Sequence, residues 1–295
     1  MLGSEFVQQF AGKGDNAWEA AALQLARAGS LVPWPWVEIP LSDGTNRATV
    51  RVQCDVLAIG TLEDRLRLPL TPSAGQNILN LFGWVYPTPW LVYQMYRAAP
   101  LKLEPQPIQN RPANLVDFAR HSAMIDEQLR AVGAPPNDPR LRSGMKKHVV
   151  VSNIEKPDHV VIYGWFRPPP APDVFDDHRK ENVPGRQPVQ PRSNLHGAGF
   201  VDYSHGIHAV DGTALVDAPG ILQGEIATAD LYAHPVLSRL VSNEGPLRRP
   251  RYRASVPAPP PRRFGEATAR ANFHQIPTLP RYGDPGLEVL TGRRI

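Results

Sequence analysis

Cysteine is nearly absent from this sequence, since Cys54 is the only one in 295 residues. One thiol cannot form a disulfide framework, a cysteine-based zinc site or a CxxC redox motif. The alternating pattern of residues 49–56 predicts that this thiol is buried on a strand. The cysteine content therefore leaves the cellular compartment open.

Long hydrophobic runs are missing as well. The longest, Leu31–Val37 and Val160–Phe166, fall far short of the ~20 apolar residues that a membrane helix needs, so we expect no membrane span. The 23 glycines show no three-residue period, which excludes a collagen-like chain. No basic segment followed by an apolar one occurs in the first thirty residues. Because Gly3–Phe6 matches the translation of two adjacent cloning sites, we interpret residues 1–14 as a cloning scar or leader.

Proline, by contrast, is abundant. The chain has 33 prolines, roughly 11% of its residues and about twice the ordinary share. Since proline breaks helices, we expect the excess in loops, turns and tails. Seven prolines lie in Arg167–Arg192, which reads as a long surface loop and a candidate lid. Others lie in residues 245–295, where six arginines between Arg248 and Arg263 make the positive net charge a local property.

Hydrophobic periodicity predicts an α+β fold in a single domain, residues 15–244. A helical N-terminal half would pack on a mostly antiparallel, β-rich C-terminal half, followed by a Pro/Arg-rich extended tail, residues 245–295. The predicted helices are residues 15–29, 72–82, 91–96 and 114–132, with further helical signals at 225–232 and 235–240. The predicted strands are residues 37–41, 48–59, 148–154, 159–166, 199–210 and 213–216, with a two-residue turn at Asp211–Gly212.

One window concentrates chemically useful side chains. Three of the nine histidines, His196, His205 and His208, fall within thirteen residues, together with Asp202 and Ser204. Glycines in the same window let a backbone approach a ligand closely. We interpret this window as the candidate site, with a purely structural role in a β-rich turn as the alternative.

The first mechanism that fits is nucleophilic. Ser204 would be the nucleophile, His196 or His205 the general base and Asp202 the orienting carboxylate. The segment partly resembles the nucleophile elbow of α/β-hydrolases, but Asp202 replaces a small residue there and no helical pattern follows. Four further side chains and one glycine complete the predicted binding set: Tyr203, Gly206, His121, Lys147 and Tyr163. This mechanism needs no cofactor.

The second mechanism uses zinc, which His196, Asp202, His205 and His208 could hold. The window is similar to the Ser-x-His-x-x-Gly-x-Ala-x-Asp pattern of zinc D-Ala-D-Ala carboxypeptidases, although its spacing is one residue short and the later Glu-x-x-His is missing. The window is also similar to the Ser-His-Gly-Cys of L,D-transpeptidases, but Ile207 stands where their nucleophile would be.

A looser resemblance spans residues 50–245. Tyr163-Gly164-Trp165, Gln190-Pro191, His196 and the run from Asp202 to Ile207 resemble an uncharacterised group of bacterial, often exported proteins. The resemblance implies one domain with this motif at its centre and suggests an extracytoplasmic location. It implies no particular activity.

From these patterns we expect a hydrolase, such as an esterase, that cleaves an ester or amide bond in a small-molecule or polymer substrate. The alternative is a non-catalytic binding or structural module, for example a cell-surface or virion component. A zinc-dependent, cell-wall-peptidase-like hydrolase is a second alternative. We interpret Lys146–Lys147 as a solvated strand edge, and the arginine cluster as a passive tail without a specific nucleic-acid signal.

Overall fold

The computed structural model describes residues 1–110, 113–167 and 189–260. In these residues helices and mostly antiparallel sheets are combined, so the predicted α+β class is confirmed. None of the helices in this part of the chain is long and apolar enough to cross a membrane. Most of the predicted loop Arg167–Arg192, which is the candidate lid, lies outside the described residues. The tail beyond residue 260 also lies outside them.

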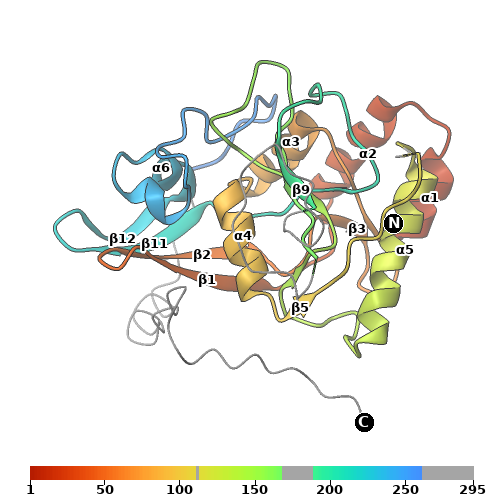
Figure 1. Ribbon diagram of the computed structural model, residues 1–295. Coiled ribbons are helices and arrows are strands. Elements are labelled where there is room, and N and C mark those ends of the chain that lie inside the picture. The colour runs from red at the N-terminus through yellow and green to blue at the C-terminus, as the bar shows by residue number, and fades with distance from the viewer. Residues whose placement is uncertain (111–112, 168–188, 261–295) are drawn as a thin grey trace, which may run out of the picture.

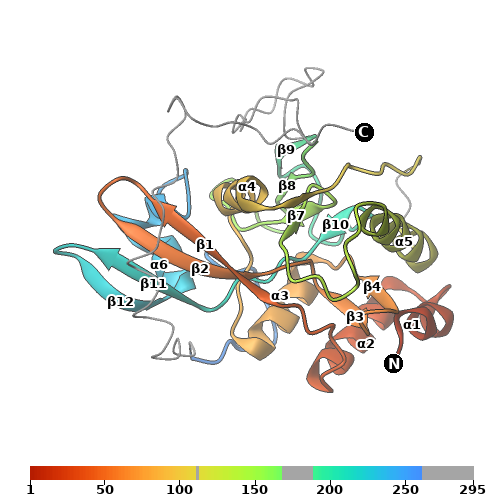
Figure 2. The same cartoon turned by 90° about the horizontal axis from the view of Figure 1, so that it is seen from below.

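The larger sheet has the strand order β1-β2-β11-β12 and forms one side of the molecule (Figures 1 and 2). The expected hairpin of its first two strands is confirmed by their antiparallel pairing. Asp43 closes the turn between them, since its Oδ1 accepts from the N–H groups of Thr45 and Asn46. The last two strands of this sheet follow one another in the chain and are joined by a tight turn. The sheet consists of β1 (Trp36–Ser42), β2 (Arg47–Gln53), β11 (Thr213–Ala218) and β12 (Leu222–Ala227), all antiparallel.

The smaller four-stranded sheet holds the candidate site. Its strands, in spatial order, are β10 (His205–Gly206), β7 (Lys147–Val149), β8 (Ile162–Gly164) and β9 (Gln190–Ser193). The predicted β7–β8 hairpin is confirmed, with strands shorter than expected. Two-stranded pairs of β3 (Ala58–Gly60) with β4 (Arg65–Arg67), and of β5 (Leu101–Lys102) with β6 (Arg142–Ser143), complete the sheets.

Three sequence predictions are wrong in the C-terminal half. Of the strand expected over residues 199–210, only His205–Gly206 forms, with isolated bridges from Val210 to Val52 and Val85. The part before His205 is a turn, which the Asp202 side chain closes on the N–H of Ser204. Asp211–Gly212 therefore joins no hairpin; β11 pairs with β12 and β2. The helical signal at 225–232 is split, since residues 225–227 belong to β12 and only α6 (Thr228–Ala233) is helical. The signal at 235–240 gives the short 3-10 helix η1 (Leu237–Leu240).

Two of the predicted helices match their start and stop signals, whereas the helix expected to be capped by Asp15 has Gly14 at its N-cap. Thr71 accepts a hydrogen bond from the N–H of Ala74 ahead of Pro72, and Gly83 ends that helix at a φ of 77°. Asn114 caps a later helix in the same way. The helices are α1 (Gly3–Phe10), α2 (Asp15–Arg27), α3 (Pro72–Phe82), α4 (Pro89–Ala98) and α5 (Leu115–Ala131). Figure 1 places α1, α2 and α5 at the end of the molecule away from the larger sheet.

The described parts of the two segments outside the predicted domain pack against it. In α1, Phe6 is fully buried in the main core. In the tail, Leu247 and Tyr252 are buried as well. The Tyr252 hydroxyl donates to the carbonyl of Val150 at 2.7 Å and accepts from the N–H of Val161 at 3.0 Å. The described start of the tail is thus part of the packed structure.

Replacing Tyr252 with Phe is expected to lower the free energy of unfolding by about 1–3 kcal/mol, because it leaves the buried Val150 and Val161 backbone groups without this partner. Urea denaturation measures the loss. Arg253→Ala, an exposed neighbour, is the control and should change stability little. Equal stability of both variants would contradict a structural role for Tyr252.

Candidate functional site

The candidate site lies on a strand buried at the edge of the smaller sheet. Every residue from Val201 to Val210 is buried, and β10 runs parallel to β7. At Gly206 a side chain has no room, because its Cβ would lie 2.9 Å from the Cβ of Lys146 and 2.9 Å from Val56. This close approach brings the serine-containing turn against Lys146.

Asp202 is the centre of the polar cluster. Its Oδ1 accepts from the Ser204 hydroxyl at 2.5 Å and from the Ser204 N–H at 2.8 Å. The same oxygen lies 3.9 Å from Nε2 of His205. The structure thus brings three of the four predicted catalytic residues together, but in an order that differs from the expected one. The carboxylate, rather than an imidazole, accepts the hydrogen bond of the serine hydroxyl.

The His205 ring is buried and neutral. It is fully shielded from solvent, and neither ring nitrogen has a hydrogen-bond partner among the described residues. Burial lowers the pKa of His205 to about 4, although Asp202 opposes this shift. At pH 7 the imidazole therefore carries no charge.

Positive charge compensates for the carboxylate of Asp202. Lys147 places its Nζ 3.7 Å from Oδ2 of Asp202 and 5.1 Å from the ring centre of Trp165. Burial alone would raise the pKa of Asp202, but its charged neighbours and the two Ser204 donors lower it below its ordinary value. The carboxylate is ionised at neutral pH.

The remaining predicted site residues lie at different places. His196 stacks on Phe200 with ring centres 4.0 Å apart, and Phe200 meets His205 edge-on at 5.7 Å. A phenyl ring thus lies between the two histidines. Tyr163 packs in a separate apolar cluster with Phe166.

His121 and Tyr203 form a second contact group behind the turn. The His121 ring, from α5, meets the Tyr203 ring edge-on at 4.9 Å. The Tyr203 hydroxyl accepts from the N–H of Ile108 at 2.8 Å. Ile108 also lines a surface hollow of about 530 Å³ between the 107–110 loop and the start of α5, where Arg120 and Met124 form part of the wall. The Tyr203 hydroxyl thus links the His121–Tyr203 pair to Ile108, a residue that lines this hollow.

The predicted zinc ligands do not assemble. Nε2 of His208 lies 2.5 Å from the carbonyl oxygen of Gln53, and its ring packs 5.4 Å from that of His148. Among residues 1–110, 113–167 and 189–260, no three His, Cys, Asp or Glu side chains are grouped so that they could hold a metal ion. The set His196, Asp202, His205 and His208 is thus not a preformed site.

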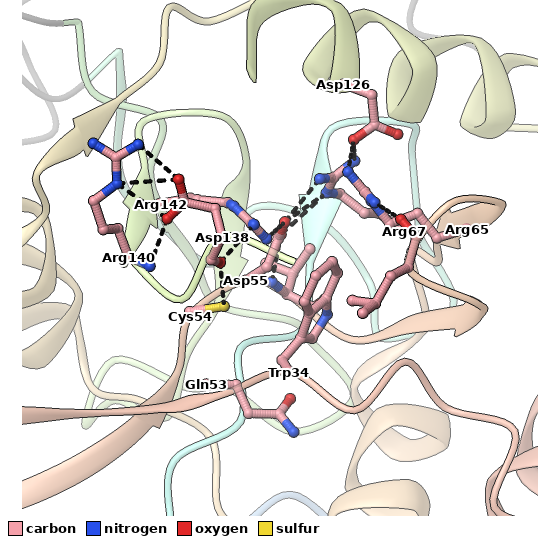
Figure 3. Close-up of polar contacts among 12 residues, drawn as sticks. Trp34, Gln53, Cys54, Asp55, Arg65, Arg67, Asp126, Asp138, Arg140 and Arg142 are labelled. Atoms are coloured by element: carbon pink, nitrogen blue, oxygen red, sulfur yellow. Dashed lines mark hydrogen bonds and ion pairs between the residues drawn. The ribbon is translucent and has the colours of Figure 1, made fainter. Parts of the chain in front are cut away.

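Sequence reasoning missed two features. Lys146 and Lys147 are 0% and 8% exposed, so the prediction of a solvated strand edge is wrong; Lys146 is buried by its contact with the 203–206 segment. The other feature is a buried ion network around Asp55, which binds Arg67 and Arg142 at 2.7 and 2.9 Å (Figure 3). A signal for it existed, since a charged residue directly after a buried strand is costly unless it is paired.

Comparison of the chain with protein-family models, with curated proteins and with solved structures found no match.

Proposed function

We propose that this protein is a hydrolase that cleaves an ester or amide bond with Ser204 as its nucleophile. One observation supports the proposal: Oδ1 of Asp202 accepts the Ser204 hydroxyl and also lies 3.9 Å from the His205 imidazole. A serine hydroxyl, a carboxylate and an imidazole thus share one buried location, where electrostatic interactions are stronger than in water.

In the proposed reaction Ser204 attacks the acyl carbon and forms an acyl-enzyme, which water then hydrolyses. Asp202 holds the hydroxyl before attack and is the counter-charge for Lys147. His205 makes no hydrogen bond to Ser204 in this arrangement. Catalytic hydrogen bonds are often formed only once substrate is bound.

Replacing Ser204 with Ala is expected to abolish covalent labelling by a fluorophosphonate probe and turnover of activated esters, while the melting temperature stays within a few degrees. The reason is that the only group lost is the hydroxyl that would attack. Mass spectrometry of the labelled peptide should place the adduct on Ser204.

Ser238→Ala is the matched control, since it removes another buried serine hydroxyl outside the candidate cluster and should leave labelling unchanged. Labelling of wild-type protein that survives in Ser204→Ala would contradict the proposal. Loss of the fold in Ser204→Ala would favour a structural role instead.

The non-catalytic alternative is favoured by a specific observation. Asp202, Ser204 and His205 are 1%, 0% and 0% exposed, and the Asp202–Ser204 hydrogen bonds are those of a local turn. A structural or binding module needs no access to these groups. Concentration-dependent assembly, with no activity on broad ester, amide and glycan panels, would support this alternative.

A further inference from the structure

Lys146 is held against the backbone of the 203–206 segment, which carries the candidate nucleophile Ser204. Its side chain is fully buried, and its Nζ donates to the carbonyl of Tyr203, the residue before Ser204, at 2.6 Å. Its Cβ and Cγ pack against Gly206, where any larger residue would collide with them. The lysine stem is therefore fixed on one side of the 203–206 segment.

The charges around Lys146 come from other parts of the fold. Arg67 repels a positive charge at this position, whereas Asp202 and Asp55 attract one. Both carboxylates already have partners: Asp55 binds Arg67 and Arg142, and Asp202 accepts from Ser204. Lys146 makes no ion pair with any of the described residues. The titratable and charged groups that face it are Arg67, Asp55, Asp202, His121 and His205.

These surroundings make the amine of Lys146 available as a proton acceptor. Burial, followed by the repulsion from Arg67, lowers the pKa of Lys146 to about 7. A large share of the molecules therefore holds a neutral amine at neutral pH. A base whose pKa lies near the working pH is the most effective one. The imidazole of His205 is less suited, because neither of its nitrogens is oriented by a hydrogen bond.

We propose that Lys146 is the general base that takes the hydroxyl proton of Ser204, an inference that rests on the proposed function. As the bond from Oγ to the acyl carbon forms, the proton passes from Oγ to Nζ, and the resulting ammonium gives it to the leaving alcohol or amine. In the second half, the amine takes a proton from the attacking water, and Oγ recovers one when the acyl bond breaks. The Ser204 hydroxyl must turn from Asp202 toward Nζ when substrate binds.

The test is the pH dependence of labelling by a fluorophosphonate, which needs no knowledge of the substrate. In this reaction the Oγ–P bond forms, fluoride leaves and the proton passes to the base. For wild-type protein the labelling rate should rise with pH through an inflection near 7, because only the neutral amine accepts a proton. Lys146→Met should label at least about 100-fold more slowly and lose the inflection.

Lys146→Arg separates the base from a structural cation. Arginine keeps the charge and a donor for the Tyr203 carbonyl, but it does not deprotonate, so labelling should stay slow at every pH. Lys102→Met, which removes a lysine of the β5 strand that donates to Ala99, should keep the wild-type rate and profile. His205→Gln should keep the inflection, whatever its rate.

The outcomes distinguish the two proposals. Wild-type protein that shows no adduct on Ser204 overturns the proposed function, and this inference with it. Wild-type protein that is labelled on Ser204, with the same inflection in the Lys146 variants, overturns only the role of Lys146. If neither variant folds, an NMR titration of the Lys146 side chain in wild-type protein decides: a change near pH 7 supports the proposal, and an ammonium that persists to pH 10 overturns it.

Discussion

Replacing Asp55 with Asn is expected to lower the free energy of unfolding by about 3–5 kcal/mol, because it leaves two buried guanidinium groups without their carboxylate. Asp55 is fully buried and receives donors from Arg67, Arg142 and the N–H of Val56. In Figure 3 its carboxylate lies between the two arginines. Removing one partner of such a group costs far more than the pair itself contributes.

The network extends beyond this carboxylate. Arg67 also donates to Asp126 at 2.8 Å and to the Ser122 carbonyl at 3.2 Å, which ties β4 to α5. Arg142 donates to the Asp138 carbonyl at 2.9 Å, and its guanidinium lies 4.8 Å from the ring centre of Trp34. Loss of Asp55 should therefore loosen several elements at once.

The same variant should change how stability depends on pH. Burial alone would raise the pKa of Asp55, but Arg67 and Arg142 outweigh it and hold this pKa well below its ordinary value. A carboxyl with a depressed pKa in the folded state contributes stability that is complete above its unfolded pKa of about 4 and is lost as the pH falls below it. Asp55→Asn should remove this part of the acid sensitivity, so its unfolding free energy should fall less steeply between pH 5 and 2.

Guanidinium denaturation at several pH values measures both effects. Arg239→Gln is the control, because it breaks the ion pair with Asp43 while its own side chain is 56% exposed; it should cost less than about 1 kcal/mol. A similar small loss in Asp55→Asn would show that the network adds little to the fold.

Where structure depends on neighbours in the chain, the sequence is a good guide. Thr71 and Pro72 start α3 and Gly83 ends it, because capping and positive φ are properties of single residues. The turn at Asp43 between β1 and β2 follows for the same reason. These features were predicted within one or two residues.

Where structure depends on distant pairing, the sequence misleads. The pattern over residues 199–210 is typical of a strand, yet the Asp202 side chain bonds back to Ser204, and only His205–Gly206 forms a strand, with isolated bridges at Val210. Lys146 looks like a surface residue until β10 pairs beside it. The window around Ser204 was found from composition, but composition did not reveal that Asp202 rather than a histidine would hold the hydroxyl.

Replacing Phe6 with Ala is expected to cost about 3–5 kcal/mol, the usual loss for a fully buried phenylalanine. Phe6 is 0% exposed and belongs to the main core, and α1 contacts β3, β4 and α5. Gly3 also approaches β4 so closely that an added Cβ would lie 2.6 Å from the backbone of Arg65 and Leu66. A helix seated in this way is expected to stabilise the domain, whatever the origin of its residues.

Phe10→Ala is the matched control, because Phe10 lies in the same helix, with its ring 4.8 Å from that of Phe6, but is only partly buried. It should lose clearly less stability in chemical denaturation, since its side chain removes less apolar surface from water. Equal, small losses in both variants would mean that residues 1–14 act as a leader that the domain does not need. A large loss confined to Phe6→Ala would make α1 an integral part of the core. An N-terminal truncation that keeps the domain stable would then have to retain Gly3 and all residues after it.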